Sequence, residues 1–292
     1  MTTAHDVRSG KGEHDENFPV ASVLVAPRHR PPILAFYRFA RSADDVADHA
    51  TLSQTQKLDF LDRLEATLLG RSDAEPDALP LREALARYHL GAQHALDLLT
   101  AFRRDVTKRR YESWAELMDY CRYSASPVGR FVLDVHGESQ TTWPANDALC
   151  TALQVINHLQ DCGKDYRAID RVYLPRESLD RHGARIEDLS ADRATPQLLA
   201  VIRELAGKTD DLVAHARTFA PQIRDARLGI EVAVITRLAE KLNGWLAVRD
   251  PLAEKVHLSK GHALWVAGAG AAREAVVRLV RPKPAASVRR AS

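Results

Sequence analysis

The residues from Tyr37 to Asp48 combine an aromatic ring, a guanidinium group and three carboxylates at helical spacing. At about 100° per residue one helical face would carry Tyr37, Arg41, Asp44, Asp45 and Asp48. Like charges four residues apart destabilise an isolated helix by about 0.2–0.5 kcal/mol per pair, so this face needs compensation. A bound divalent cation would supply it; a solvated acidic surface is the alternative.

A second acidic stripe lies far along the chain, within Gln154–Asp165. Asn157, Asp161 and Asp165 are again spaced by four, with Gln154 one turn earlier on the same side. Two such helices facing each other could hold several hard cations between their oxygen atoms. Mg²⁺ binds few protein carboxylates and completes its coordination with water and phosphate oxygens. The pair of stripes therefore predicts a diphosphate held through a cluster of Mg²⁺ ions.

Helical periodicity and prolines indicate the elements that carry these stripes. The first acidic helix is expected to start near Pro31, and Pro144 is expected to open the second. No sustained period-two segment with hairpin turns occurs, so the sequence predicts an all-α fold. Between the stripes, Tyr111–Val135 has an amphipathic pattern whose middle holds small residues, and Pro127 should kink it. Those small residues would admit either a ligand or a neighbouring helix.

Two further segments leave alternatives open. Arg171 and Tyr173 follow the second stripe, where they could close over an anion or simply anchor a loop. The basic run Arg103–Arg110 could face phosphate or form a solvated helix end. His158, beside the second stripe, is expected to be a packing or hydrogen-bonding residue.

Composition excludes several classes of function. The 292 residues fit one large domain or two ordinary ones, and a 45% hydrophobic content allows a sizeable core. A net charge of +2, from 41 basic and 39 acidic residues, argues against nucleic-acid binding. The sequence contains no Walker loop, no GxGxxG motif after a strand, no serine-hydrolase elbow and no HExxH.

Cysteine usage and hydropathy indicate a cytoplasmic protein. The three cysteines form no CxxC pair and are expected to be reduced thiols: Cys121, Cys150 and Cys162. No apolar run approaches the roughly 18 residues that span a bilayer, and no signal peptide opens the chain. Gly261–Pro282, small and apolar with interspersed arginines, is expected to be a helix. It could lie at the inner face of the membrane or pack on the bundle.

Four motifs give the chain a recognisable pattern. They are YxxxRxxDDxxD at Tyr37–Asp48, YC(x)₆VG at Tyr120–Gly129, NxxxDxxxD at Asn157–Asp165 and RxYLP at Arg171–Pro175. The pattern resembles the squalene and phytoene synthase family from His14 to about Lys260. This resemblance implies a single-domain isoprenoid-synthase-type helical bundle with a central active-site cavity. We expect residues 16–282 to form that domain, with a flexible segment at 1–15 and a disordered tail at 283–292.

The resemblance also implies roles for individual residues. The metal ligands would be Asp44, Asp48, Asn157, Asp161 and Asp165. The positions that contact the diphosphate or gate the pocket would be Tyr37, Arg41, Arg171 and Tyr173, with Asp45 beside them. Other substrate contacts would be Phe18, Tyr120, Gln154 and a late arginine, Arg249. Gln160 departs from some relatives, which carry a basic residue there, so one phosphate contact is in doubt.

Two features are similar to one branch of the family, the bacterial hydroxysqualene synthases of hopanoid biosynthesis. They are the opening GKGEHDENFPVAS and the segment YCRYSASPVG, which places Ser124 and Ser126 where relatives carry Val and Gly. A hydroxyl there could hold a water molecule near a carbocation, and that role is our inference. The branch implies that presqualene diphosphate and water give hydroxysqualene and diphosphate, with Mg²⁺ and without NADPH.

Two alternatives remain beside this interpretation. The chain could be a head-to-head prenyltransferase, making presqualene diphosphate, phytoene or dehydrosqualene from two prenyl diphosphates. It could also be a non-catalytic assembly factor of the same fold, which predicts eroded acidic motifs, whereas every metal-ligand position named above is intact. Functional coupling to other squalene-pathway enzymes is expected in the catalytic cases.

Overall fold

Prolines and side-chain caps set where the helices begin. The structure is a computed structural model that describes residues 3–4 and 25–258. Prolines occupy the first turns of α1 and α7, where a missing N–H removes no helical hydrogen bond. The helices of the described residues are α1 (Arg30–Asp48), α2 (Gln54–Leu68), α3 (Leu79–Tyr88), α4 (Gln93–Thr107), α5 (Trp114–Ser124), α6 (Ser126–Val135), α7 (Trp143–Ile169), α8 (Arg176–His182), α9 (Pro196–Ala216) and α10 (Ala226–Leu246). The predicted starts near Pro31 and Pro144 are confirmed.

The all-α prediction is also confirmed. Within residues 3–4 and 25–258, the one β-type pairing is an isolated parallel bridge between Arg110 and Val172. Short 3₁₀ helices join some of the α-helices, including η2 (Pro27–His29), which leads into α1. Hydrophobic packing between helices therefore carries the fold.

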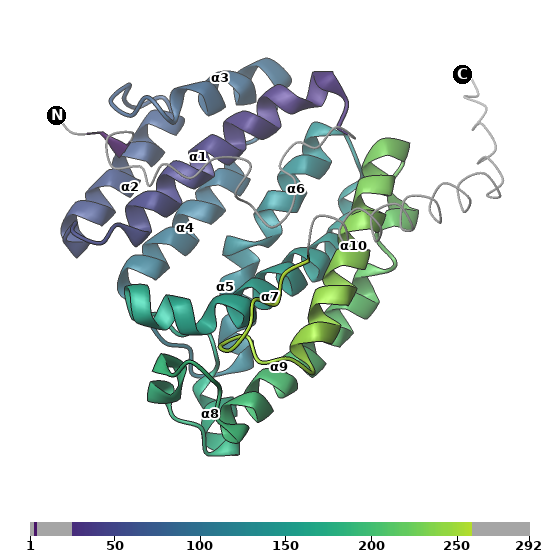
Figure 1. Cartoon of the computed structure of the whole chain (residues 1–292). Helices are drawn as coiled ribbons and strands as arrows, with labels where there is room; N and C mark the ends of the chain where they lie inside the picture. Colours follow the sequence, from purple (N-terminus) through teal and green to yellow (C-terminus); the bar gives the residue numbers. More distant parts are fainter. Residues whose placement is uncertain (1–2, 5–24, 259–292) are drawn as a thin grey trace.

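The helices form a bundle around α1 and α7 (Figure 1). α1 packs against α2, α3 and α4, and their apolar faces meet in a cluster that includes Phe39, Leu64 and Leu98. α7 packs against α6, α9 and α10 around a second cluster that includes Ile156 and Ile202. This arrangement places both acidic stripes inside one bundle, as the sequence predicted.

The predicted kink at Pro127 is a one-residue interruption at Ala125. α5 ends at Ser124, Ala125 has φ −118° and ψ −51° and still donates its N–H to the carbonyl of Cys121, and α6 begins at Ser126. Gly129 then packs against α7 so closely that an added Cβ would lie 2.0 Å from Asn146 Oδ1. The small residues of this segment therefore allow close helix packing, and Ser124 and Gly129 also border the internal cavity described below.

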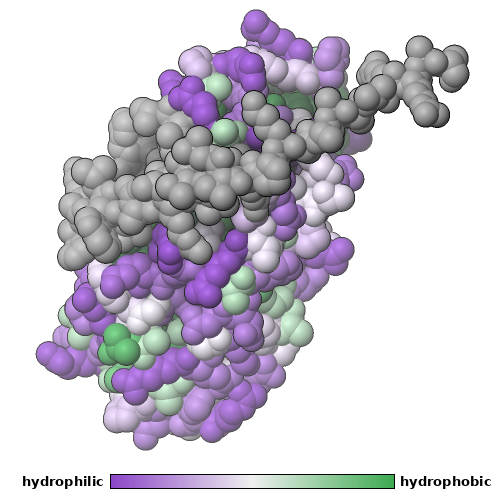
Figure 2. Space-filling model, turned by 90° about the vertical axis from the view of Figure 1, so that its right-hand side faces the viewer, coloured by the Kyte–Doolittle hydropathy of each residue, from purple (hydrophilic) through white to green (hydrophobic). Residues whose placement is uncertain are grey.

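The face of the molecule in Figure 2 is mainly polar where it is coloured. Hydrophilic residues predominate on the coloured face in Figure 2, and hydrophobic ones are scattered over it. Among the described residues no helix combines the length and apolarity needed to cross a membrane. The expectations for residues 5–15, for Phe18 and for the segment Gly261–Pro282 fall outside the described residues.

Substituting two glycines should separate close packing from helix propensity. Gly129→Ala should lower the free energy of unfolding by about 1–3 kcal/mol, because its methyl group would overlap Asn146 and also meet Cys150 Sγ at 2.7 Å. Gly207 is at an exposed position of α9, where an added Cβ meets no atom of the described residues within 4 Å, so Gly207→Ala should raise it by about 0.5–1 kcal/mol. Urea denaturation followed by circular dichroism measures both changes. Equal effects in the two variants would contradict the packing assignment.

Candidate active site

A cavity of about 530 Å³ lies between α1, α4, α5, α6, α7 and α10. Along α1, Ile33 and Phe36 line its apolar part, and Asp44 and Asp48 line its polar part. The stretch from Ile33 to Asp48 corresponds to about 22 Å of helix axis at 1.5 Å per residue. On α7 the order is the same, with Leu149 in the apolar part and polar residues toward the helix C-terminus. The site thus joins an elongated apolar compartment to a charged end.

The first acidic stripe lines the charged end as predicted, with one exception. Tyr37, Arg41, Asp44 and Asp48 all border the cavity. Arg41 holds its neighbours in place, with Nη1 3.1 Å from Asp44 Oδ2 and Nη2 2.9 Å from Asp45 Oδ1. Asp45 itself is buried and is not among the cavity-lining residues, so the structure places it as the partner of Arg41.

Three residues of the second stripe line the same cavity. Gln154, Asn157 and Asp165 border the cavity. Gln154 Nε2 lies 3.2 Å from His158 Nε2, which orients the amide. Asp161 is not among the residues lining the cavity in this structure, and its Oδ2 lies 3.4 Å from Lys164 Nζ.

Burial makes the charged end electrostatically unfavourable for its own carboxylates. Burial raises the pKa of Asp44 to about 7, with a further contribution from Asp48 that outweighs Arg41. Burial also raises the pKa of Asp165 to about 7, helped by Asp161. The partial negative charge at the C-terminus of α1 adds to the repulsion between the carboxylates, because the last turn of α1 contains no basic residue.

This donor set fits magnesium. Carboxylate oxygens and one amide oxygen are the ligands that a hard divalent cation prefers. A cation between the two stripes would also offset the burial and the carboxylate repulsion that together raise the two pKa values. The residues that would hold it are the predicted ligands, with Asp44, Asp48, Asn157 and Asp165 at the cavity wall.

Arg171 is fixed between the two stripes by the segment that follows α7. Its Nη1 lies 2.8 Å from Asp48 Oδ1, and its side chain is only 8% exposed. The next residue, Val172, donates its N–H to the carbonyl of Arg109 at 2.9 Å and forms the parallel bridge with Arg110. The guanidinium therefore faces the cavity from a pinned backbone, and both Arg171 and Tyr173 line it, as predicted.

Asp105 of α4 is a site residue that the sequence analysis missed. Its carboxylate accepts hydrogen bonds from Tyr120 at 2.7 Å and Tyr173 at 3.2 Å, and its carbonyl accepts one from Arg171 at 3.0 Å. Burial raises the pKa of Asp105 to about 6, while Arg171 and the Tyr120 hydrogen bond oppose the shift. The only hint in the sequence was that Asp105 is the one acidic residue within the basic run Arg103–Arg110.

His158 is buried beside this network, and the sequence interpretation of it as a packing residue agrees with its geometry. Its ring stacks on Tyr173 with centroids 3.5 Å apart and an interplanar angle of 15°. Burial, together with the nearby charge of Arg171, lowers the pKa of His158 to about 3. The imidazole is therefore neutral at ordinary pH and offers an aromatic face.

Two other predicted contacts, Ser126 and Arg249, lie away from the cavity lining, and so does Gln160. Ser126 is buried, and its carbonyl accepts a hydrogen bond from Asn146 on α7. Arg249 stacks on Trp245, with its guanidinium carbon 4.2 Å from the ring centroid, so it is held outside the cavity. Gln160 donates from its side chain to the carbonyl of Val256.

The basic run is paired with surface carboxylates. Arg103 contacts Asp62, Arg104 contacts Asp119 at 2.7 Å, and Arg109 contacts Asp170 at 3.0 Å. These pairs make the run a salt-bridged surface where α4 ends.

Comparison with known proteins places this site in a family. The family model described as squalene/phytoene synthase matches residues 11–262. The chain belongs to the squalene/phytoene synthase family. It is 56% identical over 278 residues to a hydroxysqualene synthase of Rhodopseudomonas palustris, covering 95% of each protein. It is also 56% identical over 259 residues to the hydroxysqualene synthase of Sinorhizobium fredii, covering 89% of each.

A solved structure agrees with this family assignment. The squalene synthase HpnC from Alicyclobacillus acidocaldarius superposes with a TM-score of 0.68 and 33% sequence identity, covering 77% of this chain and 85% of that one. The isoprenoid-synthase-type bundle expected from the sequence is confirmed.

The neutrality of His158 can be tested in the ligand-free protein. Its imidazole resonances should not titrate between pH 5 and pH 8, because the pKa in the folded state is about 3. In the unfolded chain the value should be near 6.5. Between these values the unfolded state binds more protons, so this residue lowers the stability as the pH falls through that window. Imidazole NMR spectra, with His158→Asn to assign the signal, measure the titration. A midpoint near pH 6.5 in the folded protein would contradict this site geometry.

Proposed function

We propose that this chain converts presqualene diphosphate and water to hydroxysqualene and diphosphate in squalene and hopanoid biosynthesis. One observation carries the proposal: a single cavity joins a cluster of carboxylates and arginines to an apolar compartment lined along α1, α6, α7 and α10. The charged end suits a diphosphate, and the apolar part suits a long hydrocarbon. The names of relatives that are 56% identical over most of both chains support the same reaction.

The arginines provide the anion-binding part of the mechanism. Arg41 and Arg171 line the charged end and are already held by carboxylates, Arg171 at 2.8 Å from Asp48. Charge-assisted hydrogen bonds from guanidinium groups to phosphate oxygens are stronger than neutral ones and fix orientation. Magnesium ions held by the aspartates would stabilise the charge that develops on the leaving diphosphate.

The apolar compartment governs the fate of the carbon skeleton once the diphosphate has left. The carbon–oxygen bond breaks with its electron pair leaving on diphosphate, so a carbocation remains in the cavity. Phe36 and Phe131 stack with centroids 4.1 Å apart, and both line the cavity. Such walls exclude bulk water, so that only a positioned water adds. A new carbon–oxygen bond then forms, and the released proton goes to diphosphate.

Ser124 is the residue best placed to hold that water. It lines the cavity, while its Oγ is buried and makes no hydrogen bond among the described residues. A serine that bonded to a carbonyl one turn back would not leave its hydroxyl in this state. A buried hydroxyl without a partner costs free energy, and a water molecule in the cavity would satisfy it. Position alone then suffices, because a carbocation needs no strong base to activate the water.

The reaction class is part of the same proposal. A single prenyl diphosphate that loses diphosphate and captures water makes the chain a carbon–oxygen lyase, without NADPH. The alternative is a prenyltransferase that joins two prenyl diphosphates. The product is insoluble in water. We therefore also propose that the protein contacts the inner face of the membrane and is functionally coupled to neighbouring pathway enzymes.

Product analysis tests the proposal directly. Purified protein should convert presqualene diphosphate with Mg²⁺, and without NADPH, to hydroxysqualene, whereas farnesyl diphosphate alone should give no C30 product. Gas chromatography with mass spectrometry identifies the products. If farnesyl diphosphate yields presqualene diphosphate or dehydrosqualene, the chain is a prenyltransferase.

Removing a metal ligand should abolish turnover and preserve the fold. Asp48→Asn and Asp161→Asn each remove one negative charge. The Asp48 side chain is 38% exposed and the Asp161 side chain 35% exposed, so little packing is lost. Activity in each should fall at least about 100-fold, while the circular dichroism spectrum stays helical. Asp119→Asn, on the exposed pair with Arg104, is the matched control and should retain activity. Normal turnover by either metal-site variant at ordinary Mg²⁺ concentration would exclude the proposed cluster.

The two serines should differ in their effect on the product. Ser124→Val should leave diphosphate release largely intact and shift the product from hydroxysqualene toward hydrocarbons formed by proton loss or rearranged alcohols. Ser126→Gly should change the product little, because Ser126 lies outside the cavity lining. Diphosphate release and product ratio are measured on the same samples. Clean hydroxysqualene from Ser124→Val would mean that another group positions the water.

A further inference from the structure

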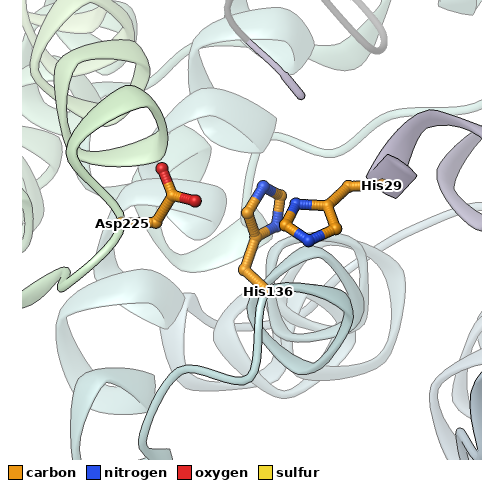
Figure 3. Close-up of side chains that lie close together, drawn as sticks. All are labelled: His29, His136 and Asp225. Atoms are coloured by element: carbon orange, nitrogen blue, oxygen red, sulfur yellow. The ribbon is translucent and has the colours of Figure 1, made fainter. Parts of the chain in front are cut away.

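A second group of metal-binding side chains lies away from the aspartate cluster. His29, His136 and Asp225 each present a ligand atom, and these atoms lie within 4.8 Å of one another. Figure 3 shows the two imidazoles side by side, with the carboxylate of Asp225 turned toward them from another element. The ring centroids of His29 and His136 are 4.0 Å apart with an interplanar angle of 69°. None of the three lines the prenyl diphosphate cavity.

Two of the three side chains are oriented by their own elements. His136 caps the C-terminus of α6, and its Nδ1 donates to the carbonyl of Val132 at 2.8 Å, which leaves Nε2 with a lone pair. Asp225 caps the N-terminus of α10 through Oδ1, which accepts the N–H groups of Arg227 at 2.9 Å and Leu228 at 3.1 Å. Its Oδ2 takes no part in these two capping bonds. Histidines and carboxylates fixed by a second hydrogen bond in this way are typical of metal sites.

His29 supplies an independent observation. Its Nδ1 is buried and has no hydrogen-bond partner in the described structure. Its Nε2 accepts a hydrogen bond from Arg28 Nε at 3.0 Å. With a metal on Nδ1, the proton would move to Nε2 and the exposed Arg28 side chain would turn away into solvent. A metal would thereby satisfy the one ring nitrogen of His29 that the described residues leave without a hydrogen-bond partner.

We propose that His29, His136 and Asp225 form a binding site for a divalent transition metal, with zinc as the reference ion. Two imidazoles and one carboxylate suit zinc and its neighbours, whereas the aspartate cluster suits magnesium. Tetrahedral zinc with ligands at about 2.0–2.2 Å places them roughly 3.3 Å apart, and small side-chain rotations would reach that separation from the present one. Water would complete the coordination.

The site would fasten three elements at the apolar part of the cavity. His29 ends η2 just before α1, His136 ends α6 and Asp225 begins α10. The residues bonded to two of the ligands, Val132 and Leu228, line the cavity itself. Because an ion that binds only the folded state stabilises it, zinc would hold the apolar end of the cavity together without entering the reaction.

Zinc titration of the full-length protein tests the site. Chelator-treated protein is titrated with ZnCl₂ by calorimetry in excess Mg²⁺, which competes for the aspartate cluster. Wild-type protein should bind one equivalent, and its melting temperature should rise on zinc addition. His136→Asn keeps an amide donor for the Val132 carbonyl, and Asp225→Asn keeps a good helix cap. Each variant should bind zinc at least tenfold more weakly.

The controls keep this test separate from the proposed function. His215→Asn removes an exposed histidine from α9 and should bind zinc like the wild type. Circular dichroism without zinc establishes that each variant is folded, and if His136→Asn is not, Asp225→Asn carries the comparison. A cobalt-substituted wild-type protein should show the visible absorption of a tetrahedral site that both ligand variants lack. Absence of zinc binding by the wild type, or wild-type binding by the two ligand variants, would overturn the proposal whatever reaction the enzyme catalyses.

Discussion

Repulsion among carboxylates at the charged end of the cavity is the constraint on which the rest of this structure depends. Asp44 and Asp48 stand near the C-terminus of α1, and Asp165 stands near that of α7, so the helix dipoles add to the unfavourable charge. Burial raises the pKa of Asp44 and of Asp165 to about 7. The bundle keeps them together because extensive apolar packing of α1 and α7 holds the helices in place. Local stability is thus given up where the site needs concentrated negative charge.

The sequence was sufficient to predict features whose parts lie within one helix. Spacing by four put Asp44 and Asp48 on one face, and the structure lines the cavity with both. Proline positions gave the starts of α1 and α7 for an equally local reason. The network of Asp105 could not be predicted in this way. Its partners Tyr120 and Tyr173 stand 15 and 68 residues away, so only the fold brings them to it.

The two serines show where periodicity stops being informative. Ser124 and Ser126 are two residues apart, and the sequence assigned both to the substrate pocket. The helix breaks between them at Ala125, so Ser124 ends one helix beside the cavity and Ser126 begins the next one, against α7. Arg249 illustrates a related difficulty, because stacking on Trp245 decides its direction and no local pattern reports it.

At Asp170, the C-cap of α7, the residue that suits the backbone differs from the residue that suits the active site. Asp170 has a left-handed backbone with φ 52°, a conformation that glycine adopts with less strain. Its carboxylate, however, pairs with Arg109 and Arg110, the strand-like residues against which the segment after α7 is pinned. Asp170→Gly would relieve the backbone strain and is an obvious substitution for raising thermal stability. That exchange would loosen the support of Arg171, so thermal robustness and active-site order favour different residues at this one position.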